Sequence, residues 1–243
     1  MAPRIFIGDD VAAFAAGAEY RLASRAARHV ANALRMRVGA ALTLFTGTGG
    51  EYSATLAHID RRDVVVRVER HDPIERESAH AATLVQSLIA AEMMDFVVRK
   101  AVELGAAAIV PVQAARSQAI AADRAERRVA HWRQIAISAC EQCGRNRIPN
   151  VSPIVMLVEW IDAHADAAAI LDVDAKRSLA AQTATAPPRA IAVGPEGGFT
   201  ADEVQRATSR GAVAVHLGRR VLRAETAAIA ALATLDAIAG DAK

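Results

Sequence analysis

The sequence predicts an α/β protein in which a parallel sheet carries helices on both faces and follows a small β-rich domain. After about residue 80, short apolar runs alternate with helical patterns, which is typical of a covered parallel sheet. Before residue 72, several strand-like segments accompany a single helical pattern. A polar stretch that contains a proline separates the two regions. We therefore predict a first domain over residues 1–72, a linker over 73–80 and a second domain over 81–243.

The first domain has the signals of a small sheet or barrel with one helix. Alternating or apolar runs predict strands, and residues 47–50, which are rich in glycine, predict a turn between two of them. Apolar residues at helical spacing predict a helix over residues 24–36. The expected strands are residues 5–7, 41–45, 52–56 and 64–68.

The second domain alternates strands and helices along its whole length. Apolar runs predict strands, and periodic segments between them predict helices, one of which is expected to begin with a capping box at Thr200 and Glu203. The expected strands are residues 83–89, 108–112, 169–173, 190–193 and 213–217. Further helices are expected over residues 92–104, 123–143 and 224–239.

Composition excludes several classes of protein. Hydrophobic residues make up 53% of the 243 residues, which favours a packed core over disorder, and the net charge is only +2. The N-terminal residues lack the apolar core of a signal peptide, and no apolar run has the length of a membrane span. Two cysteines in the whole chain fit a reducing compartment. We expect a cytoplasmic protein with no membrane partner and no bound metal.

A glycine-rich loop is expected where the strand over residues 190–193 ends. It reads Gly194-Pro195-Glu196-Gly197-Gly198, and three glycines in five residues would let backbone groups approach a ligand closely. In open α/β sheets, ligands bind at the carboxyl ends of the strands. The spacing differs from that of dinucleotide and phosphate-binding loops, since neither G-x-G-x-x-G nor a following Gly-Lys-Ser/Thr is present.

A second strand-to-helix loop follows the strand over residues 213–217. Arg219, Arg220 and Arg223 lie just before or at the start of a helix, where cations oppose the helix dipole. An anionic or polar ligand would offset this cost. Glu225 lies in the first turn of the helix, where simple compensation of the dipole explains it as well as a catalytic role does.

Two features of residues 116–147 have ordinary and functional explanations. Arginines outnumber acidic residues there, which is compatible with a solvated helix face or with a surface for a polyanion. Cys140 and Cys143 form a lone C-x-x-C without further zinc ligands at matching spacing, which favours plain buried or half-buried thiols.

Several segments together resemble one bacterial family, the small-subunit ribosomal RNA methyltransferase E family, of the SPOUT superfamily. Residues 29–35 resemble its H-x-x-x-V-L-R segment, residues 100–105 its K-A-x-E-L-G helix end, and residues 141–149 its E-Q-x-G-R-x-x-I-P segment. Arg4 resembles an arginine of the N-terminal strand, and the two loops resemble the last two signature motifs. The chain departs from the family at Ala90 and Ala91, where a lysine is frequent.

The resemblance implies a PUA-like N-terminal domain, a SPOUT methyltransferase domain with a C-terminal trefoil knot, and a homodimer. It implies S-adenosylmethionine as cofactor and a uridine of small-subunit ribosomal RNA, 16S rRNA, as substrate, free or in the assembled subunit. The residues expected to line the cofactor are Leu171, Val193, Gly194, Pro195, Gly197, Gly198, Leu217, Gly218, Val221, Leu222, Thr226 and Ala227. Those expected to contact RNA are Arg4, His29, Arg35, Arg116, Arg145 and Arg147.

The implied reaction transfers a methyl group to N3 of the uracil. Arg223, with Arg220 next, is expected to stabilise the negative charge that develops on the base. Glu225 or Glu196 is expected to accept the N3 proton, and the sequence does not decide between them. The alternatives are an RNA-binding module without catalysis, a nucleotide-dependent enzyme, and a related methyltransferase acting on another RNA.

Overall fold

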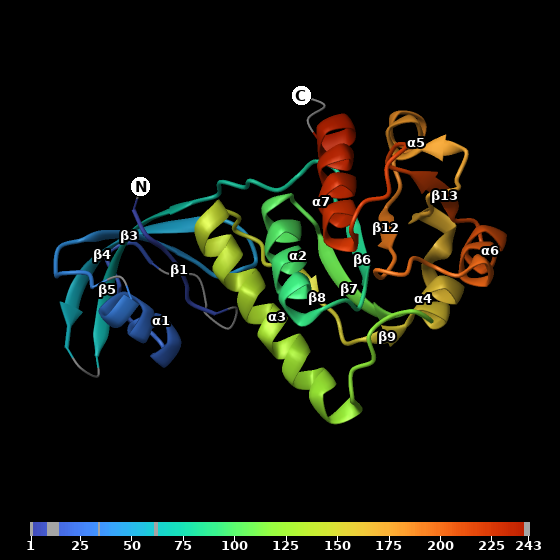
Figure 1. The fold of residues 1–243 in the computed structure, drawn as a ribbon. Coiled ribbons are helices and arrows are strands. Elements are labelled where there is room, and N and C mark those ends of the chain that lie inside the picture. Colours follow the sequence, from blue (N-terminus) through green and yellow to red (C-terminus); the bar gives the residue numbers. More distant parts are fainter. Residues whose placement is uncertain (1, 9–14, 34, 61–62, 241–243) are drawn as a thin grey trace. The chain divides into compact units, whose positions relative to one another are not determined.

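The chain divides into two compact units. The computed structural model describes residues 2–8, 15–33, 35–60 and 63–240. The N-terminal unit comprises residues 1–77 together with 140–148, and the C-terminal unit comprises 78–139 and 149–243. The chain leaves the first unit inside the segment that sequence analysis predicts as the linker, but residues 140–148, predicted for the second domain, belong to the first unit. Figure 1 shows the elements of both units.

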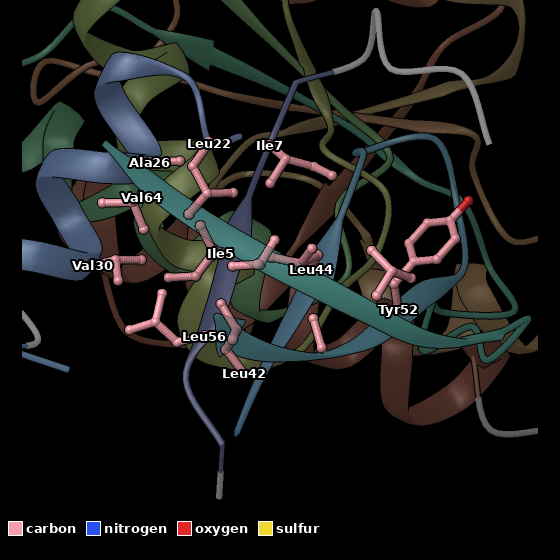
Figure 2. Close-up of a cluster of buried hydrophobic side chains, with 13 residues drawn as sticks. Ile5, Ile7, Leu22, Ala26, Val30, Leu42, Leu44, Tyr52, Leu56 and Val64 are labelled. Carbon is pink, nitrogen blue, oxygen red and sulfur yellow. The ribbon is translucent and has the colours of Figure 1, made fainter. Parts of the chain in front are cut away.

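The N-terminal unit is built on a five-stranded sheet. Its order is β1-β3-β4-β5-β2, and β1 pairs with β3 in parallel while the other neighbours are antiparallel. Side chains alternate between buried and accessible along β4, so one face of the sheet forms a core. Figure 2 shows this core, in which Ile5, Leu44 and Leu56 are fully buried. The strands are β1 (Arg4–Phe6), β2 (Glu19–Arg21), β3 (Ala41–Phe45), β4 (Glu51–Ile59) and β5 (Val64–Asp72).

One helical segment packs on this sheet. Helix α1 (Ser24–Arg28) continues as a π-helical turn, η1 (His29–Ala33), and buries Ala26 and Val30 against the core. The helix is shorter than the predicted range 24–36, of which residue 34 lies outside the described residues. Arg35 has φ 48°, a left-handed conformation that is incompatible with a continuing helix.

The C-terminal unit is built on an eight-stranded sheet in which every recorded pairing between described residues is parallel. Its order is β11-β13-β10-β12-β6-β7-β8, and β9 also pairs with β7. The central strands are almost wholly buried, as expected where both faces are covered. The strands are β6 (Thr83–Ser87), β7 (Ala108–Gln113), β8 (Asn150–Val151), β9 (Val155–Met156), β10 (Ala168–Leu171), β11 (Arg177–Ser178), β12 (Ala190–Val193) and β13 (Val213–His216).

Helices cover both faces of this sheet (Figure 1). Helices α4 and α6 contact each other and share a core with the sheet that includes Val85, Trp160 and Ala207. Helix α7 contacts β6 and β12 as well as α2 and α5. The helices are α2 (Ala91–Glu103), α3 (Ala122–Cys143), α4 (Leu157–His164), α5 (Leu179–Thr185), α6 (Ala201–Ser209) and α7 (Ala224–Leu235), with short turns η2 (Ala165–Ala167) and η3 (Asp236–Gly240). The predicted α/β fold class is confirmed.

The start of α6 matches the sequence prediction, whereas several other elements were not predicted. The capping box of α6 is present, because the Thr200 hydroxyl accepts from the Glu203 amide and the Glu203 carboxylate accepts from the Thr200 amide. Strands β2 and β11, which are short and polar, were not predicted. Helices α4 and α5 were not predicted either, and β5 runs on to Asp72. Among the described residues, no helix combines the length and apolarity needed to cross a bilayer.

Candidate functional site

Three neighbouring parallel strands of the C-terminal unit end at the same edge of the sheet. Strand β10 pairs with β12 on one side and with β13 on the other, and Leu171 is in register with Val215. The glycine loop follows β12, and the arginine-rich loop follows β13. Parallel strands therefore bring the two predicted loops, which are about twenty residues apart in sequence, to one edge of the sheet.

A cavity lies between these loops, and most of the residues predicted to bind the cofactor line it. Its walls combine backbone of the glycine-containing loops with apolar side chains. The predicted residues that line it are Leu171, Val193, Gly194, Pro195, Glu196, Gly198, Leu217, Gly218, Arg220, Val221, Leu222 and Ala227.

Four of the predicted residues do not line the cavity. Gly197 is exposed, and its carbonyl oxygen is turned to the Arg116 guanidinium. Thr226 and Glu225 lie between Ala224 and Ala227, which do line the cavity, so the helical turn directs them elsewhere. Arg223 is the N-cap residue of α7, and its side chain is exposed.

Five other residues line the cavity without having been predicted. Asp172 and Val173 follow β10 directly, and Val215 and His216 are the last residues of β13. These four residues lie at the carboxyl ends of parallel strands, where ligands bind in open α/β sheets. They could therefore have been predicted from the sequence as lining residues. Ala224, at the start of α7, completes the set.

The glycine loop has a compact backbone that a larger residue at its first position would disturb. A Cβ on Gly194 would lie 3.1 Å from the Phe199 nitrogen and 3.3 Å from the Gly198 Cα. The Gly198 amide donates to the Pro195 carbonyl at 2.9 Å, and Gly198 has φ +68°, which favours glycine. The close approach of the loop to itself thus favours glycine at position 194.

Two neighbouring loops hold the glycine loop from outside the cavity. The Ala90 amide, after β6, donates to the Glu196 carboxylate at 3.2 Å. The Arg116 guanidinium, after β7, donates to the Gly197 carbonyl at 2.8 Å. Loops from β6, β7 and β12 therefore form one connected rim at the carboxyl edge of the sheet.

The arginine-rich loop carries positive charge that no carboxylate of the described residues neutralises. Arg219, Arg220 and Arg223 are exposed, and among the described residues none of the three side chains forms an ion pair or hydrogen bond. The loop itself is ordered by the Gly218 amide, which donates to Nδ1 of His216 at 3.0 Å. Uncompensated cations beside a cavity with a polar backbone rim favour a ligand that is anionic or develops negative charge.

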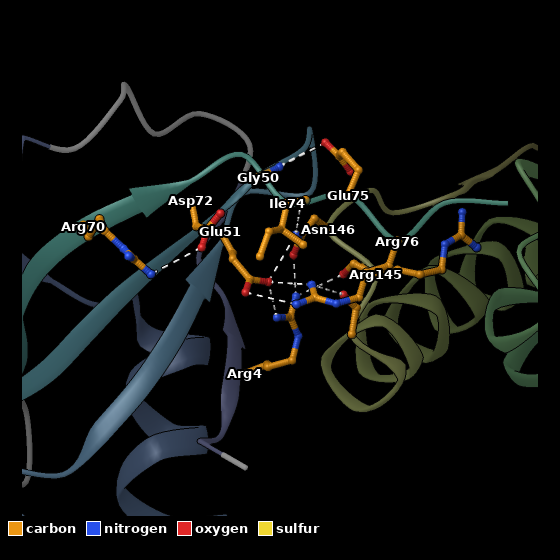
Figure 3. Close-up of polar contacts among 11 residues, drawn as sticks. Arg4, Gly50, Glu51, Arg70, Asp72, Ile74, Glu75, Arg76, Arg145 and Asn146 are labelled. Atoms are coloured by element: carbon orange, nitrogen blue, oxygen red, sulfur yellow. Dashed lines mark hydrogen bonds and ion pairs between the residues drawn. The ribbon is translucent and has the colours of Figure 1, made fainter. Parts of the chain in front are cut away.

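Arg4 and Arg145, which sequence analysis assigns to RNA, lie instead in a buried ionic network of the N-terminal unit (Figure 3). Arg4 donates to the Glu51 carboxylate at 2.6 Å and to the side-chain oxygen of Asn146, and Arg145 pairs with Glu77. Their side chains are only 6% and 5% exposed. We correct the prediction for these two residues, because a buried guanidinium with carboxylate partners has no face open to a phosphate.

Glu51 is the centre of this network. Its carboxylate accepts from Arg4, from both terminal nitrogens of Arg76 and from the Asn146 amide. The hydrogen bonds from Arg76, followed by those from Arg4 and Asn146, outweigh the effect of burial and lower the pKa of Glu51 to about 2. The network fastens residues 145–146 to the first strands and explains why this segment belongs to the N-terminal unit.

The other residues predicted to contact RNA have accessible side chains. Arg147 is 56% exposed and pairs with Glu75 at 3.1 Å. Arg35 and Arg116 are exposed, and His29 is half-buried at the start of η1. These four keep the predicted role as a hypothesis.

The two cysteines are free thiols. Cys140 is buried, and burial raises the pKa of its thiol to about 12, while Cys143 is half-buried. Within the described ranges, no group of three or more His, Cys, Asp or Glu side chains is placed to hold a metal ion.

A second, larger cavity of about 600 Å³ lies at the opposite edge of the same sheet. Its lining includes Thr83, Ala108 and Ala190, the first residues of β6, β7 and β12. None of the predicted functional residues lines it.

Comparison with protein families places the two parts of the chain. Residues 22–69 match a family described as an RNA methyltransferase PUA domain, and residues 76–236 match an RNA methyltransferase domain. The second match alone covers well over half of the chain.

Individual relatives extend the similarity over the full length. The chain is 29% identical to ribosomal RNA small subunit methyltransferase E of Buchnera aphidicola, covering 99% of this chain and 95% of the relative. It is 34% identical to that of Mycobacterium bovis over 84% of this chain and 80% of the relative.

Solved structures agree in fold. The structure of ribosomal RNA small subunit methyltransferase E from Neisseria gonorrhoeae, bound to S-adenosyl methionine, superposes with a TM-score of 0.91 at 35% identity and covers 100% of both chains. A Legionella pneumophila protein in complex with the bound cofactor SAM gives 0.89 at 34% identity and 98% coverage of both. The chain belongs to the ribosomal RNA small subunit methyltransferase E family.

Proposed function

We propose that this protein transfers the methyl group of S-adenosylmethionine to N3 of one uridine in 16S ribosomal RNA. The observation that carries the proposal is the cavity at the carboxyl edge of the parallel sheet, lined by both loops that resemble the family's last signature motifs. Two solved relatives of similar length hold the same cofactor. Family membership supports RNA, and small-subunit ribosomal RNA in particular, as the substrate.

The chemistry of the cavity fits the cofactor. Apolar side chains such as Leu171, Leu217 and Leu222 suit an adenine ring, and backbone groups of the glycine loop suit its polar edge. Asp172 adds a carboxylate for the cationic or hydroxyl parts of the molecule. Glycine at 194 keeps the loop close enough to form this wall.

S-adenosylmethionine supplies a methyl group on a positively charged sulfur. The residues of this chain hold the uracil in line with that group and manage the charge that develops when N3 loses its proton. We assign stabilisation of the negative charge on the uracil oxygens to Arg220, which lines the cavity, ahead of Arg223, which does not. Of the two candidate proton acceptors, Glu196 lines the cavity, and we therefore place it ahead of Glu225.

Single substitutions test these roles. We expect Arg220→Ala to lower kcat by about 100-fold or more while S-adenosylmethionine affinity changes by less than about threefold, as for removal of an oxyanion donor. Arg219→Ala is the matched control, because Arg219 is also exposed in the same loop but does not line the cavity. Near-normal turnover of Arg220→Ala with severe loss in Arg223→Ala would return the role to Arg223.

A homodimer, a cytoplasmic location and a knotted C-terminal segment complete the proposal. Support for the dimer comes from two exposed apolar residues at the rim of the cavity, Val173 at 64% and Val221 at 82% exposure. The knot rests on the family resemblance and on the position of β13 between β10 and β11. Light scattering on the purified protein measures its mass directly, and a monomer at micromolar concentration would remove the dimer from the proposal.

The function itself is tested with small ribosomal subunits from a strain that lacks the protein. Labelled S-adenosylmethionine should place label in 3-methyluridine of the 16S RNA when the purified enzyme is added. Label in another nucleoside or another RNA would favour a related methyltransferase with a different target. Failure to bind S-adenosylmethionine in calorimetry would favour an RNA-binding module without catalysis.

A further inference from the structure

A separate cavity of about 150 Å³ lies between helices α2 and α3 in the C-terminal unit. Its apolar lining includes Ile89, Met94 and Trp132, which are 4%, 1% and 1% exposed. Its polar lining consists of Gln118, Arg124 and Arg128. We call this the α2–α3 cavity; it combines buried apolar side chains with a cationic and amide rim.

The two arginines of this cavity have no carboxylate partner in the part of the chain that the structure describes. Among the described residues, no ion pair or hydrogen bond involves either guanidinium or the Gln118 side chain. Asp95, which faces α3 from α2, is bonded to His131 and Trp132 instead. Arg124 and Arg128 are four residues apart on one helix, so two like charges lie close together, which is unfavourable without an anion between them.

The neighbouring arginines of α3 behave differently. Arg127 pairs with Asp123 at 3.8 Å, and Arg133 donates to the Val151 carbonyl at 3.0 Å. Arg124 and Arg128 therefore differ from Arg127 and Arg133 in two ways: they line a cavity, and their guanidinium groups have no partner among the described residues.

The α2–α3 cavity and the candidate cofactor cavity are connected through residues of the same loops. Ile89 and Ala91 line the first, and Ala90 between them donates its amide to Glu196, which lines the second. The loop that carries Gln118 also carries Arg116, which is bonded to the glycine loop. A ligand in the α2–α3 cavity would thus contact the same rim that encloses the reacting groups.

We propose that the α2–α3 cavity binds one nucleotide of the RNA substrate, with Arg124 and Arg128 on its phosphate and its base over the apolar floor. The inference rests on the proposed function and adds a substrate subsite to it. Two neighbouring arginines can together bind one phosphate. The edge of a base offers both hydrogen-bond donors and acceptors to the Gln118 side-chain amide. The cavity is small, at about 150 Å³, which suits a single base rather than a nucleic-acid helix.

The test compares the double variant Arg124→Ala/Arg128→Ala with the control Arg127→Ala. Arg127 lies on the same helix and carries the same charge, but it is paired and does not line the cavity. The probe is the small ribosomal subunit from a strain that lacks the protein. Binding is measured on filters between about 50 and 200 mM salt, together with KM, kcat and S-adenosylmethionine affinity.

The double variant should bind the subunit at least tenfold more weakly than the control. The slope of log affinity against log salt should become shallower by about 0.7 for each phosphate of a single strand that the variant no longer neutralises. KM should rise with little change in S-adenosylmethionine affinity, and Arg124→Lys/Arg128→Lys should recover most of the salt slope.

Equal RNA affinity and equal salt slope in the double variant and the control would overturn the subsite. Failure of the wild-type protein to methylate the subunit or to bind S-adenosylmethionine would instead overturn the proposed function. The two failures are distinguishable, because RNA binding is measured without methyl transfer.

Discussion

Substitution of Glu51 by glutamine should weaken the N-terminal unit by an amount that the ionic network sets. The Glu51 side chain is 14% exposed and accepts from Arg4 at 2.6 Å and from Arg76 at 2.8 Å and 3.2 Å. These contacts lower its pKa from 4.5 to about 2. At about 1.36 kcal/mol per pKa unit, the charged form contributes about 3 kcal/mol at pH 7.

The same shift predicts a pH dependence with a definite sign. The folded-state pKa is lower than the unfolded value, so the unfolded state binds the proton more readily as the pH falls. The stabilisation is complete above about pH 5 and is lost towards pH 2, with about 2 kcal/mol gone by pH 3. In Glu51→Gln this part of the acid dependence should be absent.

Hydrogen exchange of β4 and β5 amides, corrected for intrinsic rates, measures the opening free energy of this unit. Glu19→Gln is the control, since Glu19 pairs with Arg67 while the two side chains are 53% and 59% exposed, and its loss should stay below about 1 kcal/mol. The reasoning would be refuted if Glu51→Gln opened within about 1 kcal/mol of the wild type at pH 7, or if both proteins lost stability equally between pH 5 and pH 3.

Substitution of Gly194 or Arg116 and modification of Cys140 each have a measurable consequence. Gly194→Ala should raise the dissociation constant for S-adenosylmethionine at least tenfold in calorimetry, because its Cβ would lie 3.1 Å from the Phe199 nitrogen; an unchanged constant would mean that the loop tolerates the shift. Arg116→Ala should raise the same constant by about three- to tenfold, the value of one hydrogen bond to the Gly197 carbonyl, and Arg116→Lys should restore part of it; equal binding by all three proteins would contradict the bracing role. Cys140, buried and with a thiol pKa raised to about 12, should react with iodoacetamide at pH 8 at least 100-fold more slowly than Cys143 in the folded protein, and comparable rates by mass spectrometry would contradict its burial.

The sequence predicts those elements whose signal is local. Strands β3 and β12 have the predicted bounds, because each is a short apolar run limited by glycine or proline. Strand β2, Glu19–Arg21, is a polar edge strand whose pairing with β5 defines it, and its own residues carry little strand signal. The ends of helices differ by a few residues for a similar reason, since tertiary contacts decide them.

The site could be predicted as a pair of loops but not as a set of side-chain directions. Parallel strands require the ends of β12 and β13 to meet, so the loops themselves follow from the order of strands and helices. Whether Arg220 or Arg223 lines the cavity depends on where α7 begins, and sequence alone favours the opposite order.

The role predicted for Arg4 and Arg145 was wrong because their partners are distant in sequence. Arg4 and Asn146 are 142 residues apart, and Arg145 and Glu77 are 68 residues apart. The role of Arg4 was expected from the family resemblance, and that of Arg145 also from the excess of arginine over residues 116–147. Neither signal shows which acidic residues elsewhere in the chain neutralise these cations. The structure supplies those partners for Arg4 and Arg145, whereas among the described residues Arg124 and Arg128 have no carboxylate partner.

The most direct test of the central claim is nucleoside-resolved mass spectrometry of 16S ribosomal RNA from cells with and without this protein. One 3-methyluridine should disappear when the protein is absent. It should return with the wild-type protein and not with Arg220→Ala. Full retention of every 3-methyluridine in the deletion strain would contradict the proposed activity.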